Sequence, residues 1–209
     1  AARKFAALMP VTDELLDDSV INFANYVAGL MARYYPYFID DAILNGNGAA
    51  KPLGIIQDPN TLVVNRAGAG AVTFADCCNM WERLNSIFTN PIFLMSKAVC
   101  SDLRQEVDGY GNPIWRDSFF QGISQVQAPN ICGVPVVVTD LVSALGTKGD
   151  VVLCAPEFYG LIIRQGLTYA ESDHFYFDTD EKALRWVGRC DGKEMVHEAF
   201  VVLGDAQGN

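Results

Sequence analysis

Apolar residues in the first quarter of the chain repeat at intervals of three and four. The repeat continues past a proline and comprises Val20, Phe23, Val27, Leu30, Met31, Tyr34, Phe38, Ile39, Ala42 and Ile43. Such spacing places the side chains on one face of a helix. Asp18 or Ser19 suits the N-cap, and Gly46 suits a helix stop. The pattern predicts one long amphipathic helix, which Pro36 should kink or break near Tyr35.

Two further helices are predicted from capping residues. Thr73 with Asp76 forms a variant of the capping box, and apolar residues follow at intervals of three and four as far as Phe88. Ser96 caps another helix, in which Val99, Leu103 and Val107 are spaced by four. Residues 57–72 and 108–113 are rich in turn formers and are expected to be loops.

Several short segments have the apolar patterns of strands. Residues 3–11 alternate, with Phe5, Ala7 and Met9 on one face, and Pro10 suits an edge strand. Further strands are expected at 91–95, 133–139, 151–154, 183–189 and 195–203. Residues 158–164 fit either a short helix or a strand. Asp191-Gly192 between the last two strands predicts a β-hairpin. The mixture of helices and strands indicates an α+β or mixed α/β chain, and α+β is preferred.

Composition limits the partners of the chain. Its 209 residues, half of them apolar, suffice for one large domain or two small ones. Lys and Arg total 15 and Asp and Glu total 25, a net charge of −10, so no general attraction to nucleic acid or anionic membranes is expected. No signal peptide or membrane-spanning apolar run is visible, which predicts a soluble protein made in the cytoplasm.

The cysteines and histidines have no metal-site spacing. There are six cysteines, no Cys-x-x-Cys, and two histidines, His174 and His197. We therefore expect no metal or cofactor, and cysteines that are buried in a reducing compartment. A cysteine hydrolase remains an alternative function, since one of the thiols could meet a histidine in the fold. A deep pocket with Cys and His within hydrogen-bond reach would favour that alternative.

Three other groups of residues have ordinary structural explanations. The segment 46–52 contains glycines and Lys51 but follows a helix, so it is a helix stop and turn, not a phosphate loop. Acidic residues before the long helix are explained by its dipole, and those between 171 and 181 by a solvated loop that could form ion pairs between subunits. The three tryptophans, expected in the core or at interfaces, are Trp81, Trp115 and Trp186.

An ordered series of short segments resembles the major capsid proteins of tailed bacteriophages. The segments span nearly the whole chain and are Pro10-Val11, Asp13 to Ser19, Leu44 to Gly48, Pro52 to Ile55, Met95 to Ala98, Gly133 to Asp140, and Asp191-Gly192 with Glu198 to Leu203. The resemblance implies an L-shaped subunit. Its peripheral domain would hold the long helix and the terminal hairpin, residues 1–72 and 171–209, and its axial domain, a mixed sheet flanked by helices, would be residues 73–170.

The resemblance also implies a function. Copies of the chain would assemble in the bacterial cytoplasm into pentamers and hexamers of an icosahedral virion shell around DNA, without sequence-specific contact. No catalytic, cofactor-binding or metal-binding residue is implied, and the chain would not be an enzyme. An encapsulin-like bacterial compartment shell is the alternative with the same fold, and a cargo peptide on the inner face would distinguish it.

Two departures from the family pattern change these expectations. The family typically has an N-terminal arm and an extended loop, and neither is recognised in this sequence. The chain starts at what resembles the returning strand of that loop, so a truncated subunit is expected. Some members form a Lys–Asn isopeptide bond with help from a Glu. Here Lys182 stands near the acceptor position and Arg189 near the helper position, so no such cross-link is predicted.

Overall fold

The chain forms two compact units. The computed structural model describes residues 2–12, 14–15, 23–112, 114–115, 130–176 and 178–205. Unit 1 comprises Ala1–Leu53 and Leu161–Lys193, and unit 2 comprises Gly54–Gly160 and Glu194–Asn209. The chain therefore crosses between the units after residues 53, 160 and 193. Asp18 and Ser19, the predicted caps of the long helix, and most of the acidic residues before that helix lie outside the described residues.

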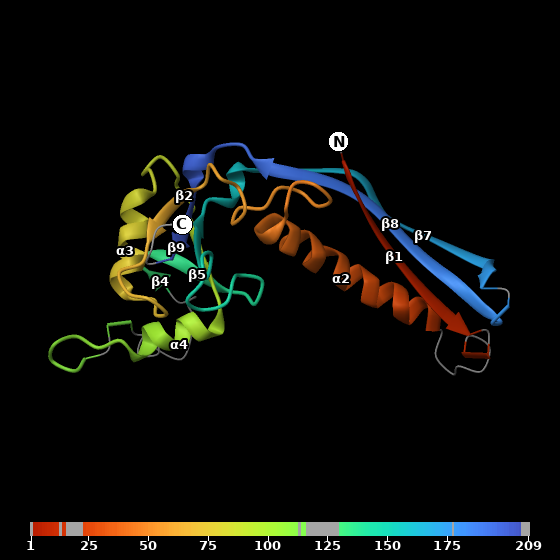
Figure 1. Cartoon of the computed structure of the whole chain (residues 1–209), viewed down its shortest axis with the longest axis horizontal. Coiled ribbons are helices and arrows are strands. Elements are labelled where there is room, and N and C mark those ends of the chain that lie inside the picture. The colour runs from red at the N-terminus through yellow and green to blue at the C-terminus, as the bar shows by residue number, and fades with distance from the viewer. Residues whose placement is uncertain are drawn as a thin grey trace, which may run out of the picture. The chain divides into compact units, whose positions relative to one another are not determined.

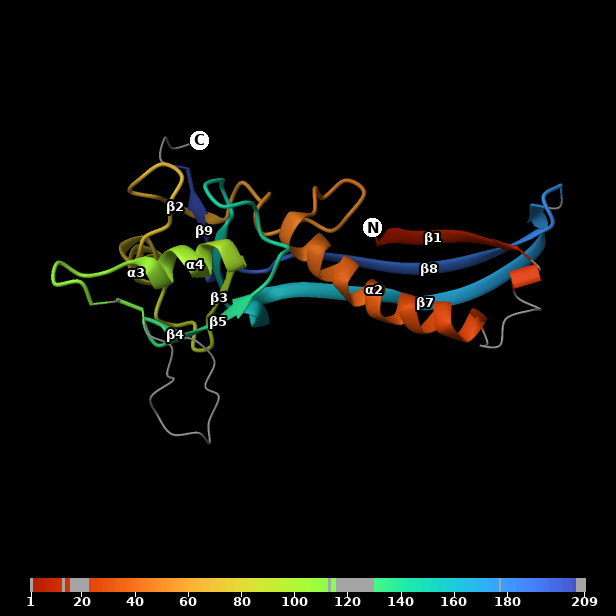
Figure 2. The same cartoon turned by 90° about the horizontal axis from the view of Figure 1, so that it is seen from below.

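Unit 1 is built on a three-stranded sheet in the order β1-β8-β7. Its strands are β1 (Arg3–Thr12), β7 (Tyr159–Tyr176) and β8 (Glu181–Glu194), and the helix α2 (Phe23–Asn45) lies along the sheet (Figures 1 and 2). β1 pairs antiparallel with β8 along its whole length. Inward and outward residues of β1 alternate as predicted, and β1 is an edge strand, which accommodates Pro10.

Helix α2 packs its apolar face onto this sheet. The buried cluster consists of Val11, Val27, Leu184 and Trp186. Further along the helix, the Phe5 ring lies 5.6 Å from the Tyr35 ring and 4.7 Å from the Phe38 ring, centroid to centroid. These contacts hold the helix on both sides of Pro36, so the assigned helix continues through the proline instead of breaking there. It ends at Asn45 as predicted, and the Gly46 amide donates to the Ala42 carbonyl at 3.0 Å.

Unit 2 contains a six-stranded mixed sheet in the order β2-β9-β6-β3-β5-β4. Its strands are β2 (Leu62–Asn65), β3 (Ile92–Met95), β4 (Asn130–Ile131), β5 (Val134–Val138), β6 (Val151–Cys154) and β9 (Phe200–Gly204). Every residue of β6 and β9 is buried. These two neighbouring strands therefore form the centre of the unit 2 core, as their continuous apolar sequences require.

The helices of unit 2 begin where their caps predicted. In α3 (Phe74–Arg83) the Thr73 hydroxyl accepts from the Asp76 amide, while the Asp76 carboxylate accepts from the Thr73 amide at 3.0 Å. In α4 (Lys97–Gln105) the Ser96 hydroxyl accepts from the Val99 amide. Both helices end before the last apolar residues of the predicted repeats. The backbone becomes extended at residues 84 and 106.

The predicted terminal hairpin is wrong. β8 runs straight through Asp191-Gly192 to Glu194, and β9 belongs to the other sheet, between β2 and β6. The reversal lies earlier, between β7 and β8, where Asp180 has a φ of 54°. Asp-Gly favours a turn only locally, whereas pairing with β1 as far as Cys190 keeps β8 extended. Glu171 and Asp173, expected in a loop, lie instead within β7.

The observed bounds of the two units differ from the predicted division of the chain. Residues 54–72 and 194–205 lie in unit 2, since β2 and β9 pair there, and residues 161–170 lie in unit 1, since β7 pairs with β8. No helix in the described part of the chain is long and apolar enough to cross a membrane. Four of the cysteines are buried and two are half-buried, and no disulfide joins them in the described structure.

Candidate interaction surface

Strand β7 carries several exposed apolar side chains along one edge of the unit 1 sheet. It is 18 residues long, it lies at the edge of the unit 1 sheet, and none of its described residues is buried. Ile162 is 70% exposed and Phe175 is 64% exposed, with Leu161, Ile163 and Tyr169 also on the surface. Such long strands are unusual, and an exposed apolar edge strand is a template for association.

The energetic balance of β7 points the same way. Fixing the backbone of one residue costs about 1–2 kcal/mol, which burial of apolar area must offset at about 25 cal/mol per Å². Within one chain β7 receives hydrogen bonds from β8 on one edge and little burial on either face. Its extended conformation is therefore better stabilised when another surface covers it.

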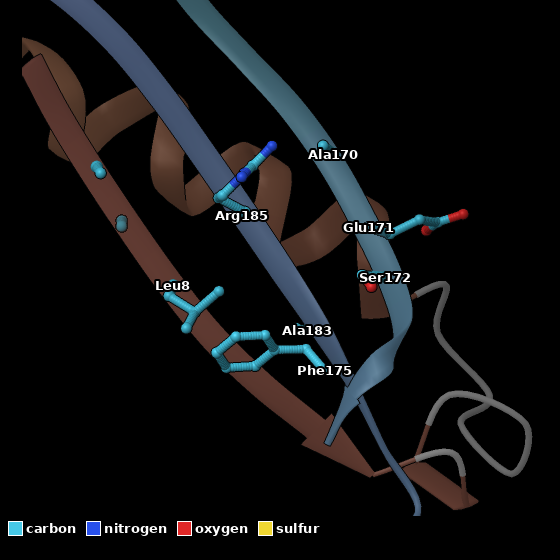
Figure 3. A pocket seen from close by; sticks show the side chains of 9 residues that line it. Leu8, Ala170, Glu171, Ser172, Phe175, Ala183 and Arg185 are labelled. Atoms are coloured by element: carbon cyan, nitrogen blue, oxygen red, sulfur yellow. The ribbon is translucent and has the colours of Figure 1, made fainter. Parts of the chain in front are cut away.

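A shallow hollow lies on the same sheet. Its volume is about 440 Å³, and its lining comes from all three strands: Ala6, Ala7, Leu8, Ala170, Glu171, Ser172, Phe175, Ala183 and Arg185. Figure 3 shows Leu8 and Phe175 projecting from the two outer strands over β8. Alanines form much of the floor, and no Cys or His lines the hollow. This chemistry suits a packed side chain better than a reacting substrate.

Helix α2 adds a stripe of tyrosines to the exposed surface of unit 1. Tyr26, Tyr34 and Tyr37 are more than half exposed. Their positions fall within a quarter turn of one another around the helix axis. Tyrosine is enriched at protein interfaces because it combines a large apolar ring with a hydroxyl. We define the assembly surface as β7, the hollow, and these three tyrosines.

Charged groups border this surface near the β7–β8 turn. The Lys182 ammonium lies 3.9 Å from the Asp173 carboxylate. The Tyr169 hydroxyl donates to Glu171 at 2.9 Å, and burial together with this carboxylate raises the pKa of Tyr169. Lys182 pairs in register with Val11, and Arg189 with Lys4. The absence of an isopeptide cross-link at Lys182 stays a prediction.

The glycine-rich segment after α2 has the local geometry of a closed turn. The Asn47 side-chain oxygen accepts from the amides of Ala49 at 3.1 Å and Ala50 at 3.2 Å. Lys51 donates to Asp41 at 2.8 Å, which lowers the pKa of Asp41, and its ammonium lies 5.1 Å from the centre of the Phe38 ring. Amides that a phosphate would need are thus already used within the turn.

No cysteine and histidine in the described residues are hydrogen-bonded to each other. His174 lies on β7, whereas His197 Nδ1 is 3.0 Å from Glu194 and 3.8 Å from Asp58. Burial raises the pKa of Cys154 to about 12, so its thiolate is scarce at neutral pH. This geometry gives no support to the hydrolase alternative, and the expectation of no catalytic residue stays a prediction.

Sequence reasoning missed several features of the structure. It expected a loop at residues 57–72, where β2 (Leu62–Asn65) pairs with β9. It placed residues 171–181 in a loop and so missed the length of β7, although Ile162, Ile163 and Tyr169 are strand formers without an intervening proline. It also missed the meeting of Asp58, Glu194 and His197, whose side chains come together only in the fold. Regular metal-site spacing, the signal sought in the sequence, is absent from this group.

Solved structures with the same fold are shells and phage particles. The capsid of an empty GTA particle matches with a TM-score of 0.83 and 18% identity, over 98% of this chain and 74% of that one. Gordonia phage Cozz gives 0.72 and 11%, over 98% and 70%. The holo-SrpI encapsulin complex of Synechococcus elongatus PCC 7942 gives 0.71 and 16%, over 99% and 75%.

Comparisons of the amino-acid sequence complement these structural matches. No curated protein sequence matches the chain. The model of the phage capsid family, in contrast, matches residues 1–205, which is nearly the whole sequence. The α+β architecture, with its long helix beside extended strands, agrees with that match. The chain therefore belongs to the phage capsid family, and its role is that of a structural capsid subunit.

Proposed function

We propose that this capsid subunit binds further copies of itself through the assembly surface, and that the copies form the pentamers and hexamers of an icosahedral shell. Strand β7 is the observation that supports the proposal best, because its 18 residues include no buried one in the described structure. A neighbouring subunit would cover these residues and offset the cost of holding them extended.

Closed symmetry explains how one chain can use the same contacts repeatedly. Copies related by rotation bury the same pair of patches at every contact, and a ring closes when the rotation divides a full turn. Stable interfaces of this kind bury about 1,200–2,000 Å² and have aromatic residues near their centre. The tyrosine stripe of α2 and Phe175 of β7 provide such residues on unit 1.

The shell would enclose DNA without reading its sequence. The net charge of −10 opposes general binding to a polyanion, so confinement, not attraction, would keep the nucleic acid inside. We further propose that unit 1 corresponds to the peripheral domain of the family and unit 2 to its axial domain. Assembly would occur in the bacterial cytoplasm, and the mature location would be the virion. No catalytic step, cofactor or membrane belongs to this proposal.

An encapsulin-like compartment shell is the second candidate, and the similarity to the holo-SrpI encapsulin complex supports it. The two candidates differ in what the shell contains. Particles purified after nuclease treatment would protect DNA in the phage case and would contain a co-purifying protein in the compartment case. The match to the phage capsid family favours DNA.

A pair of matched substitutions tests the assembly surface. Ile162 in β7 is 70% exposed, and Ile87 in the turn after α3 of unit 2 is 74% exposed. Ile162→Asp and Ile87→Asp thus introduce the same charge at equally exposed positions. The protein, expressed from its complete gene, would be examined by sedimentation velocity and negative-stain electron microscopy, with circular dichroism as the check on folding.

The expected result is shells from the wild type and from Ile87→Asp. Ile162→Asp should yield folded, smaller species, because a buried unpaired carboxylate is costly in an interface. Shells from Ile162→Asp in wild-type yield would contradict the proposed surface. A wild-type protein that stays monomeric under all conditions would contradict the proposed self-assembly.

A further inference from the structure

Two buried carboxylates and one histidine meet in unit 2. Asp58 is 3% exposed and Glu194 is 2% exposed, whereas the His197 side chain is 44% exposed. One ligand atom from each lies within 4.8 Å of the other two. His197 Nδ1 is 3.0 Å from Glu194 Oε2 and 3.8 Å from Asp58 Oδ2.

The oxygens that face away from the histidine already have donors. Asp58 Oδ1 accepts from the Asn60 amide at 2.9 Å and the Asn60 side chain at 3.1 Å. Glu194 Oε1 accepts from the Thr61 hydroxyl at 2.8 Å. These bonds fix both carboxylates so that Asp58 Oδ2 and Glu194 Oε2 point toward His197. Asp58 Oδ2 lies 3.8 Å from His197 Nδ1, and the Asp58 side chain is 3% exposed.

A bound cation would compensate the charges of the two carboxylates in this group. Two adjacent buried carboxylates repel each other, and burial of an ionised carboxylate is costly unless a positive charge compensates it. No Lys or Arg forms an ion pair with either carboxylate in the described part of the chain. Among the described residues, the only basic side chain that lies within 4.0 Å of either carboxylate is His197, and its half-exposed ring leaves a path for an ion from solvent.

We propose that Asp58 Oδ2, Glu194 Oε2 and His197 Nδ1 bind one divalent cation of the zinc class. Bonds of about 2.0–2.2 Å from such a cation to nitrogen and oxygen place tetrahedral ligands about 3.3–3.6 Å apart. The observed separations of 3.0 and 3.8 Å bracket that spacing. One imidazole with two carboxylates suits zinc better than calcium or magnesium, which favour oxygen ligands alone.

The surrounding hydrogen bonds support the same set of ligands. Thr61 orients Glu194 and Asn60 orients Asp58, as outer groups commonly orient metal ligands. Binding at Nδ1 places the imidazole proton on Nε2, and the His197 side chain is 44% exposed, so water can accept this proton. Water would complete the coordination at the open position, as three protein ligands require.

The site lies where the chain enters unit 2. The first crossing between the units is at residues 53 and 54, shortly before Asp58, and the third is at 193 and 194, immediately before Glu194. A bound cation would therefore join two entering segments that are far apart in sequence. It would stabilise unit 2 by a mass-action effect that grows with free cation concentration. This role is separate from the proposed self-assembly.

The two histidines provide a matched pair of variants. His197→Ala removes the proposed nitrogen ligand, and His174→Ala removes an exposed histidine of β7 in unit 1. The chain would be stripped with a chelator and titrated with Zn²⁺ and, separately, Mg²⁺ by isothermal calorimetry and thermal melting. Co²⁺ would serve as a spectroscopic probe, since thiolate ligands such as Cys78 or Cys132 would produce a charge-transfer band.

The expected result is one Zn²⁺ per chain, a higher melting temperature with Zn²⁺ than with Mg²⁺, and a Co²⁺ spectrum without the thiolate band. His174→Ala should match the wild type, and His197→Ala should weaken binding at least 10-fold. Glu194→Gln, which keeps the Thr61 contact, should weaken binding similarly. Equal Zn²⁺ affinity of the His197→Ala and wild-type chains, a thiolate spectrum, or no binding by the folded wild type would overturn the proposal.

Discussion

Substitution of Arg66 by Met should destabilise unit 2 more than any loss of surface charge could. Arg66 and Asp150 form a salt bridge in which the side chains are 1% and 0% exposed. Arg66 Nη1 donates to Asp150 Oδ2 at 3.0 Å and Nη2 donates to Asp150 Oδ1 at 3.1 Å. Nε donates to the Gly204 carbonyl at the end of β9, and Nη2 also donates to the Thr147 carbonyl, both at 3.0 Å.

The magnitude follows from what remains after the substitution. Asp150 would keep the Gly146 amide at 2.9 Å as a donor to its side chain, but its charge would be buried without a partner. Removal of one member of a buried pair costs about 3–5 kcal/mol. Because domains are stable by about 5–15 kcal/mol, the loss is a large part of the total. The methyl thioether of Met fills part of the volume, so the charge is the main term.

Urea denaturation of the Ile162→Asp chain, which we expect not to assemble, would measure this loss by tryptophan fluorescence and circular dichroism. Arg83→Met in α3 is the matched control, because Arg83 is exposed and should lose less than about 0.5 kcal/mol. Adding Asp150→Asn to Arg66→Met should recover part of the stability, since it removes the unpaired charge. Equal stabilities of Arg66→Met and Arg83→Met would refute the reasoning.

Three further predictions concern other parts of the chain. Pro36→Ala restores a backbone donor inside α2 and should raise the free energy of unfolding by up to about 3 kcal/mol, measured by denaturation; lower stability would show that the helix needs the proline. Trp186→Ala empties the core of unit 1 and should cost about 3–5 kcal/mol, with faster amide exchange in β1 and α2 and unchanged exchange in β6. Because burial raises the pKa of Cys154 to about 12, its thiol should stay protonated as pH rises from about 7 to 9, and native alkylation should modify half-buried Cys78 first; rapid labelling of Cys154 before unfolding, seen by peptide mass spectrometry, would contradict the burial.

Local signals in the sequence predicted local structure well. The cap at Thr73 and the cap at Ser96 both occur at the observed helix starts, because each depends on residues three positions apart. The continuous apolar run of residues 151–154 predicted a strand, and β6 is a strand that is buried at every residue. At Pro36 the local preference of proline for a helix break does not decide the structure. Packing of Phe5 against Tyr35 and Phe38 stabilises the continuous helix.

Pairing between distant segments was not predictable from these signals. Asp191-Gly192 has the residues of a hairpin turn, yet β8 continues through it. Residues 181–190 of β8 pair with β1, near the start of the chain, and the Gly192 carbonyl accepts from the Leu53 amide at 3.1 Å. β9 instead lies parallel to β2 and antiparallel to β6. The bounds of the two units follow from these pairings, which join segments far apart in the sequence.

The sequence by itself determined the helices, most strands and the resemblance to the capsid family, because caps, apolar spacing and ordered motifs act over a few residues. Only the tertiary structure decided that β7 is an exposed edge of 18 residues, and that Asp58, Glu194 and His197 meet. The meeting of Asp58 with Glu194 depends on contact between segments more than a hundred residues apart. The exposure of β7 depends on which other segments pack over it. Short-range patterns contain no information about either, since burial and proximity arise only when the whole chain has packed.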